Sequence, residues 1–438
     1  MTHKVSLYSV ILLFGIFAIF FVRFFFGVGF SSDVKWSQVY EYTVSLVQDN
    51  YVKPVPTEQV TYDALRGVCE ARDPFSEFFP PKDFERFESD MQGVYGGVGL
   101  YMRPVEEDGL IRVIVPIFGG PAYKAGIKAG DVIFAVNGET VEGRSVEAVS
   151  LLIKGVPGTE VKLTIKRPGE QKNLDFTLVR EQIHIESVQA ARMLDKSPGT
   201  AYVMMGDFQE TSPKQIEDRL TELRKQGMER LILDLRENGG GALEAALKIA
   251  DMFLAGGNVV VIRFRNGEDE VHKAKAGETF ENLPIAILID GASASASEIL
   301  AAAIQDNRRG PIVGTQSYGK GSVQQVFGID VPEHRKAGAK ITIAWFLSPL
   351  GRKISRGNEG EQYGVIPNYP VDIPKEKLPE VYKARQNEWI RFNTGVKPEG
   401  PGIEDADPQL LRAVEVLNSA NAETGPTAPA KPEKAAAE

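Results

Sequence analysis

Five apolar runs beyond residue 200 constrain the fold of this chain more than any other feature. They cover residues 201–205, 231–235, 259–264, 285–289 and 312–314, with helix-like stretches between several of them. Strands that are apolar along their whole length are buried on both faces, and such strands alternating with helices are typical of an α/β core. The sequence therefore predicts an α/β domain over residues 183–385.

The regions on either side of this core have different patterns. Residues 31–92 predict helices, including one over 58–72 that Asp73-Pro74 ends. Residues 93–182 alternate strand-like runs (110–115, 132–136, 161–166, 174–179) with glycine turns and contain one amphipathic helix over 146–154. Residues 386–418 predict a helical segment, with Asp407 as N-cap and Pro408 at the first position. Residues 419–438 are rich in Ala, Pro, Glu and Lys and predict a disordered tail.

The N-terminus carries a long apolar stretch. Residues 5–22 contain no charged side chain, and a helix of that length rises about 27 Å, close to the thickness of a bilayer's hydrocarbon region. We therefore expect residues 1–30 to be a membrane anchor, with Lys4 favouring a cytoplasmic N-terminus. A cleaved signal peptide is the alternative, with Gly27-Val28-Gly29 as a small-residue cleavage site. Either way, the rest of the chain is expected outside the cytoplasm: at the inner membrane facing the periplasm, or periplasmic or secreted after cleavage.

Composition excludes several classes of protein. The net charge of −9 and the pI near 5.3 argue against binding nucleic acid. Cys69 is the sole cysteine, so no disulfide forms within the chain, and we expect it to pack in a helix. The four histidines show no metal-ligand spacing, and neither a metal nor a cofactor is expected.

A serine-rich run and a distant lysine indicate chemistry. Residues 293–298 read Ser-Ala-Ser-Ala-Ser-Glu after the strand 285–289, and Lys320 lies 25 residues beyond Ser295. A serine hydroxyl needs a neighbouring base to become a nucleophile, and lysine serves as that base when burial holds it neutral. By local chemistry Ser293, Ser295 and Ser297 are all candidates, and all three could instead cap the following helix. Residues 314–320 also match the start of a phosphate-binding loop, but Gly321 stands where that motif needs Ser or Thr and a strand is expected next.

Taken in order, several segments resemble the C-terminal processing peptidases, or tail-specific proteases. Residues 96–100 resemble the start of that family's PDZ domain, and 119–133 resemble the PDZ core signature. Residues 233–241, Leu-Asp-Leu-Arg-Glu-Asn-Gly-Gly-Gly, resemble the strand and glycine turn before the active site. The serine and lysine segments follow in the family's order and spacing, so the resemblance spans about residues 35–375.

The resemblance implies an α/β protease core with an inserted PDZ domain, an N-terminal helical segment and a membrane anchor. It selects Ser295 as nucleophile and Lys320 as general base, and it makes Gln324 the residue that orients the lysine. If 321–327 is a strand, Gln324 and Lys320 share a face, which leaves Gln325 the weaker candidate. The oxyanion donors implied are the amide of Ala296 and that of Gly240 or Gly241; Gly239 stands where many members carry proline. The residues implied to bind a peptide's terminal carboxylate are Gly97, Val98, Gly99 and Leu100, and we expect Val98, Leu100, Val149 and Ile153 to line a pocket for the last side chain.

The sequence thus predicts a serine endopeptidase that recognises the C-termini of protein substrates through a PDZ domain and cleaves them. The expected partners are substrates with accessible C-termini, an activating adaptor, the membrane and further copies of the chain. A non-catalytic PDZ scaffold or chaperone on a protease-like fold is the alternative. A third possibility is a protease that stays idle until a partner moves the PDZ domain.

Overall fold

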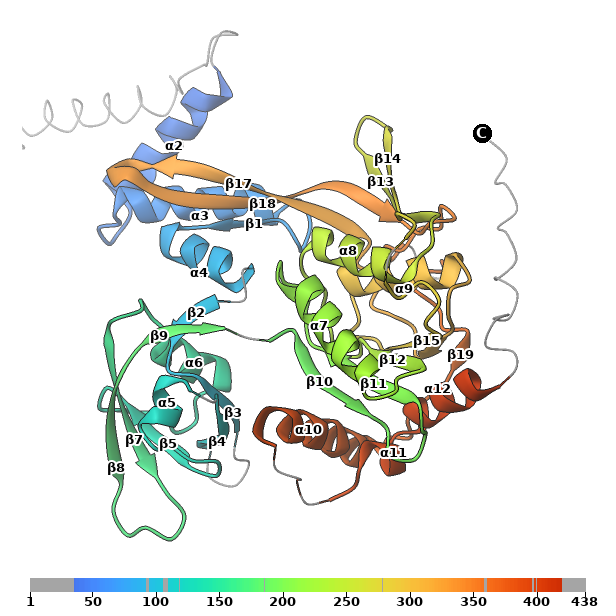
Figure 1. Cartoon of the computed structure of the whole chain (residues 1–438). Coiled ribbons are helices and arrows are strands. Elements are labelled where there is room, and N and C mark those ends of the chain that lie inside the picture. The colour runs from blue at the N-terminus through green and yellow to red at the C-terminus, as the bar shows by residue number, and fades with distance from the viewer. Residues whose placement is uncertain are drawn as a thin grey trace, which may run out of the picture. The chain divides into compact units, whose positions relative to one another are not determined.

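The computed structural model describes residues 35–91, 94–104, 109–117, 119–184, 186–277, 279–357, 361–395, 398 and 400–419 (Figure 1). The described residues up to Phe78 form one compact unit, and the described residues from Phe79 onward form a second. The predicted anchor over residues 1–30 and the predicted tail from residue 420 lie outside the described residues. Among the described residues, which begin at Lys35, no helix is long and apolar enough to cross a bilayer.

The part of the first unit that the structure describes, residues 35–78, contains two helices, as the sequence predicts. Helix α2 (Trp36–Asn50) and helix α3 (Thr57–Glu70) precede a short strand, β1 (Glu77–Phe79), at the boundary of the unit. Cys69 lies in α3, as expected for a cysteine that packs in a helix.

The second unit contains a central sheet with the predicted α/β character. The strand order is β10 (Val188–Met193), β11 (Thr200–Met205), β12 (Arg230–Asp234), β15 (Ile285–Ile289), β16 (Ile312–Gly314) and β19 (Tyr369–Pro370). Strand β10 is antiparallel to β11, and every other neighbouring pair is parallel. Between these strands the chain forms α7 (Ser212–Lys225), α8 (Leu243–Phe253) and α9 (Ala296–Asp306).

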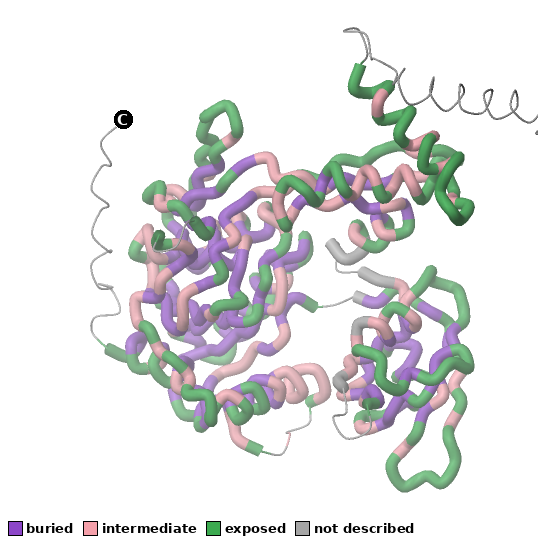
Figure 2. The backbone as a smooth tube through the Cα atoms, turned by 180° about the vertical axis from the view of Figure 1, so that it is seen from behind, coloured by how far each residue is buried: buried purple, intermediate pink, exposed green. Residues whose placement is uncertain are grey.

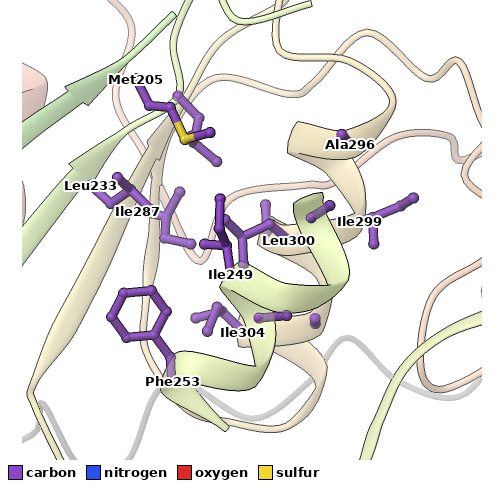
Figure 3. Packing of buried hydrophobic residues seen from close by; sticks show 14 of the residues in the cluster. Met205, Leu233, Ile249, Phe253, Ile287, Ala296, Ile299, Leu300 and Ile304 are labelled. Carbon is purple, nitrogen blue, oxygen red and sulfur yellow. The ribbon is translucent and has the colours of Figure 1, made fainter. Parts of the chain in front are cut away.

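Helices cover both faces of this sheet. On one face, Met205, Leu233 and Ile287 pack against side chains of α8 and α9 (Figure 3). On the other face, side chains such as Tyr202 and Leu288 pack against α10 (Leu378–Thr394), α11 (Ile403–Ala406) and α12 (Pro408–Asn418). The inner strands β11, β12, β15 and β16 and most of α9 are accordingly buried (Figure 2). This two-sided cover explains why these inner strands are mostly apolar on both faces.

One apolar run predicted for the core lies in another sheet. Residues 259–264 form most of β13 (Asn258–Phe264), which pairs antiparallel with β14 (Asp269–Lys273) and with β18 (Arg335–Leu347). Strand β18 also forms a long hairpin with β17 (Ser322–Val331) through the short helix η1 (Pro332–His334). Periodicity alone does not tell which sheet an apolar strand joins, because that depends on its pairing partner.

Residues 94–184 form a β-rich region with its own hydrophobic core. Its sheet has the order β3 (Leu100–Pro104), β4 (Ile111–Pro116), β5 (Val132–Val136), β7 (Glu160–Lys166) and β8 (Leu174–Val179), and β6 (Glu139–Thr140) pairs with β5. Helices α5 (Pro121–Lys124) and α6 (Val146–Ile153) belong to the same region, and β2 (Val94–Gly97) pairs with β9 (Glu181–His184). The strand-like runs and the helix expected from the sequence are all present.

The C-terminal helices begin earlier than the sequence suggests. The boundary expected at residue 385 falls inside α10, which starts at Leu378. Asp407 caps α12 as predicted, because its side chain accepts hydrogen bonds from the amides of Gln409 and Leu410, and Pro408 is the first residue of the helix. Helix α4 (Pro81–Met91), far from these helices in the sequence, also belongs to the second unit.

Candidate active site

Ser295 lies at a sharp turn between a buried strand and a buried helix. Strand β15 ends at Ile289, and α9 starts at Ala296, directly after Ser295. Ser295 has φ 55° and ψ −115°, a conformation that residues other than glycine rarely adopt. Its side chain is half-buried, whereas Ala296 behind it is buried. The turn therefore presents this hydroxyl at the N-terminal, electropositive end of α9.

The two rival serines are held in the interior. Ser293 Oγ donates to the Leu235 carbonyl at 2.8 Å, and Ser297 Oγ donates to the Asn238 carbonyl at 2.9 Å. Both residues are fully buried. Their hydroxyls tie the serine turn to the end of the neighbouring strand β12, and this geometry favours Ser295 among the three candidates.

A buried carboxylate joins the serine turn to the lysine segment. Glu298 is fully buried, and its Oε2 accepts hydrogen bonds from the amide of Ser295 at 2.8 Å and from the amide of Lys320 at 3.0 Å. Its Oε1 accepts from Ser317 Oγ and from the Gly319 amide, both at 2.6 Å. The amide nitrogens of Ser295 and Lys320 thus lie within two hydrogen-bond lengths of each other.

Two opposing effects act on the ionisation of the Glu298 carboxyl. Burial raises the pKa of this carboxyl, and the hydrogen bonds from Ser317, Gly319, Ser295 and Lys320 oppose that shift. Sequence reasoning missed this residue. A serine followed three residues later by glutamate at the start of a helix is typical of a capping box. This pattern is the signal in the sequence that could have identified Glu298.

Lys320 lies in the stretch between β16 and β17 that has no regular structure. It is half-buried, and the hydrogen bond from the Tyr318 amide to the Ser293 carbonyl, 3.0 Å, also fixes this stretch to the serine turn. Strand β17 begins at Ser322, so the resemblance of residues 314–320 to a phosphate-binding loop is followed by a strand, as expected, and not by the helix that such a loop requires.

The expected geometry of Gln324 is wrong in one respect. The strand starts one residue later than assumed, and Gly321 has φ 54°, so side-chain alternation does not carry from Gln324 back to Lys320. Gln324 Nε2 donates to Ser322 Oγ at 2.9 Å and to Thr342 Oγ1 at 3.2 Å. Its role as the residue that orients the lysine stays a prediction.

The glycine turn after β12 touches the nucleophile. A Cβ at Gly240 would lie 2.7 Å from the Cβ of Ser295 and 2.9 Å from the Ala296 nitrogen, so only glycine fits there. The Gly240 amide, however, donates to Asn238 Oδ1 at 2.9 Å and is not available to a substrate in this conformation. Gly241 has φ 145° and lies against the Phe208 carbonyl. Of the two expected oxyanion glycines, Gly241 is therefore the better candidate to act together with the Ala296 amide.

Behind this turn lies a buried ionic cluster that the sequence did not reveal. Arg236 donates to Asp234 and to Gln409, and its Nη2 lies 2.6 Å from Asp407 Oδ2 in an ion pair. Arg385 of α10 lies 3.5 Å from Asp234 and donates to the Arg236 carbonyl at 3.1 Å. Burial alone would raise the pKa of Asp234, but Arg236 and Arg385 outweigh it and hold that pKa well below its usual range. The C-terminal helices are thus bonded directly to the strand that carries the glycine turn.

The residues expected to bind a peptide terminus lie at the start of the β-rich region. Gly97 ends β2, and Leu100 begins β3. Between them, the carbonyls of Val98 and Gly99 accept hydrogen bonds from the amides of Ala122 and Ile117, both at 2.9 Å. The expected pocket residues are instead core residues: the buried cluster of this region contains Val98, Leu100, Val149 and Ile153.

Comparisons with known proteins show the family of this chain. The description of peptidase family S41 matches residues 199–371, and that of the PDZ domain matches residues 113–167. The carboxy-terminal-processing protease of Bartonella bacilliformis is 33% identical over 77% of this chain and 74% of its own length. The carboxy-terminal processing protease CtpA of Bacillus subtilis is 31% identical over 82% of this chain and 74% of its own length. Among solved structures, a Bacteroides fragilis protein described as an S41 protease aligns with a TM-score of 0.51 at 14% identity, over 89% of this chain and 98% of its own.

The α/β core, the serine turn and the β-rich region define a serine peptidase with a PDZ domain. The chain belongs to peptidase family S41, together with the carboxy-terminal-processing proteases.

Proposed function

We propose that this S41 peptidase cleaves proteins with a Ser295–Lys320 dyad after its PDZ domain has bound their C-termini. One observation carries the proposal: Glu298 accepts a hydrogen bond from the amide of each of these two residues. A single buried group therefore fixes the backbone of the nucleophile and that of the base in one frame.

The chemistry requires Lys320 to enter the reaction as a neutral amine. Lys320 Nζ takes the proton from Ser295 Oγ as the oxygen attacks the scissile carbonyl carbon. The resulting oxyanion is stabilised by the Ala296 amide at the start of α9 and by an amide of the glycine turn. The tetrahedral intermediate collapses when the lysinium returns its proton to the leaving amine, and an acyl-enzyme remains. Water then attacks the ester with Lys320 as base again, which releases the acid and restores the serine.

The PDZ part of the proposal depends on residues 97–100. Backbone amides in a turn at a sheet edge bind a peptide carboxylate when the peptide adds as a strand. Peptides with a free C-terminus should bind this region more tightly than the same peptides with an amidated C-terminus, by calorimetry on the Ser295→Ala protein. Equal affinity for both forms would remove this half of the proposal.

The dyad is tested by substitution at Lys320. Lys320→Ala and Ser295→Ala should each lower kcat for a cleaved peptide by about 10⁴-fold or more. Ser295→Ala removes the nucleophile, and Lys320→Ala removes the base that activates it. Lys336→Ala removes an exposed lysine of the β17–β18 hairpin and serves as the matched control. Wild-type turnover in Lys320→Ala would refute the dyad. No labelling of the wild type by a serine-reactive fluorophosphonate, together with no hydrolysis, would favour the scaffold alternative.

We also propose that residues 1–30 place this peptidase at the inner membrane with its catalytic domain outside the cytoplasm. The support is the uncharged stretch over residues 5–22. Fractionation and protease accessibility of intact cells test this, and a protein found wholly in the cytosol would contradict it.

A further inference from the structure

The segment that follows β18 lies directly against the lysine. We call residues 354–356 and 363–365 the lysine strap. Ser355 Oγ donates to the Gly321 carbonyl at 3.0 Å, and the Arg356 amide donates to the Gly319 carbonyl at 2.9 Å. The carbonyl groups on both sides of Lys320 are therefore bonded to the strap.

The two glycines that flank Lys320 are required by this close approach. A Cβ at Gly319 would lie 2.5 Å from the ring of Tyr363, and one at Gly321 would lie 2.2 Å from the Ser355 nitrogen. Both glycines also have positive φ, 84° and 54°. Because of these contacts, the backbone around Lys320 has little freedom to move away from the strap or to change its conformation.

Arg356 makes the most specific of these contacts. Its guanidinium carbon lies 5.0 Å from the centre of the Tyr318 ring and 4.9 Å from that of Tyr363, so the cation is stacked by both rings. Its Nε donates to the Tyr318 carbonyl at 2.8 Å. Tyr363 is in turn held through its carbonyl, which accepts from Gln316 Nε2 at 2.8 Å. Unlike lysine, arginine combines a planar face for two rings with a donor in the same plane.

We propose that Arg356 is a positioning residue for Lys320, and this proposal rests on the role of Lys320 as the base. Glu298 binds the amides of Gly319 and Lys320. The Arg356 side chain binds the Tyr318 carbonyl, and the Arg356 amide binds the Gly319 carbonyl. Backbone groups on the N-terminal side of the lysine are thus fixed both through their amides and through their carbonyls, and this fixes the point from which the lysine side chain starts. Arg356 does not contact the reacting atoms itself, so it acts through the backbone that it holds.

The test separates positioning from folding and from substrate binding. Arg356→Ala should lower kcat by about 10²-fold with KM unchanged, because a misplacement of about 1 Å in a catalytic group has an effect of that size. Guanidinium chloride at non-denaturing concentrations should restore part of the lost kcat in Arg356→Ala, since the free cation fits between the rings. Arg265→Ala removes an exposed arginine of the β13–β14 turn and should behave as wild type, with or without guanidinium.

Two further variants keep the proposal falsifiable should Arg356→Ala fold poorly. Arg356→Lys retains the charge but loses the planar stack, and it should still show most of the loss in kcat. Tyr363→Phe retains the ring and should keep wild-type kcat, whereas Tyr363→Leu should lower it.

Wild-type kcat in Arg356→Lys and Tyr363→Leu would overturn the proposal. So would a loss in Arg356→Ala that follows its melting temperature and is not rescued by guanidinium. An active Lys320→Ala would instead defeat the dyad itself, so the two failures are distinguishable.

Discussion

The nucleophile side and the base side of this site are built in different ways. Ser295 stands between a strand and a helix that are both part of the hydrophobic core, so regular structure fixes it from two directions. Lys320 stands in a stretch without regular structure, and its position is set by contacts with Glu298 and with the lysine strap. In a site of this kind the base is displaced more easily than the nucleophile. A loop held by a few contacts is less stable than a turn between a strand and a helix of the core.

Glu298 is the side chain that bonds to both sides, and among the residues that position the dyad its substitution should have the largest effect. Glu298→Gln puts an amide nitrogen in the place of one oxygen, so either the Ser295 and Lys320 amides lose their acceptor, or Ser317 Oγ and the Gly319 amide lose theirs. We expect kcat to fall by about 10²- to 10³-fold, by analogy with the loss of other preorganised groups. Peptide hydrolysis measures this, with Glu333→Gln in the exposed η1 turn as the control. Equal activity in the two variants would contradict the joint role of Glu298.

Substitutions at two adjacent glycines test how the nucleophile side is built. Gly240→Ala should lower kcat by about 10²-fold, because its Cβ would meet the Ala294 carbonyl at 2.6 Å and the Ser295 Cβ at 2.7 Å and would displace the nucleophile. Gly239→Ala has open space at the same point and should retain activity. The two variants differ by one position in one turn, so equal kinetics would show that the turn does not touch the serine in the working enzyme.

The ionic cluster behind the glycine turn should affect stability. Asp407→Asn keeps an oxygen to cap α12 but removes the charge that faces Arg236, and we expect a loss of about 3 kcal/mol in the free energy of unfolding. Asp405→Asn removes an exposed charge from the neighbouring helix α11 and should cost less than about 1 kcal/mol. Urea unfolding of both variants measures these losses. Equal stabilities would show that the buried ion pair between Asp407 and Arg236 does not stabilise the fold.

Acid should weaken the same cluster by a smaller amount. Because the pKa of Asp234 is held below its usual value, its ion pairs stabilise the fold above about pH 4, and that stability is lost as the pH falls toward the lower, folded-state pKa. Glu298 acts in the opposite direction, since its raised pKa makes protonation relieve a buried charge. We expect Asp234 to contribute a loss of about 1 kcal/mol between pH 6 and pH 3. Urea unfolding at the two pH values measures the sum, and the difference should shrink in Asp234→Asn, which removes the titrating carboxyl. A pH effect that is unchanged in that variant would place its source outside this cluster.

Much of the fold was predictable because it is encoded in local patterns. The fully apolar runs gave the central strands, and the alternation near residues 161–166 and 174–179 gave strands of the β-rich region. The capping pattern at Asp407 gave the start of α12. Residues 259–264 belong to the hydrophobic core as predicted, but their pairing with β18 is a long-range choice that no local pattern contains.

The candidate site was predictable in part. The serine run and the lysine were found from their spacing and from the family resemblance, but three serines remained equal by local chemistry. Burial of Ser293 and Ser297 separates them in the structure. The face that Gln324 and Lys320 were expected to share rests on a strand that starts only at Ser322, and the positive φ of Gly321 separates Lys320 from that strand.

The sequence by itself determined a strand, a tight turn and a helix around Ser295, because the residues that dictate each of these are neighbours in the chain. It also determined that glycines flank Lys320. Only the tertiary structure decided that Glu298 holds the amides of both residues, that Arg356 binds carbonyls of the lysine segment, and that C-terminal helices bind the strand of the glycine turn. These contacts join residues that are distant in sequence or lie in segments without periodicity. Their partners are fixed by how the buried charges and hydrogen-bond donors are satisfied when the whole core packs.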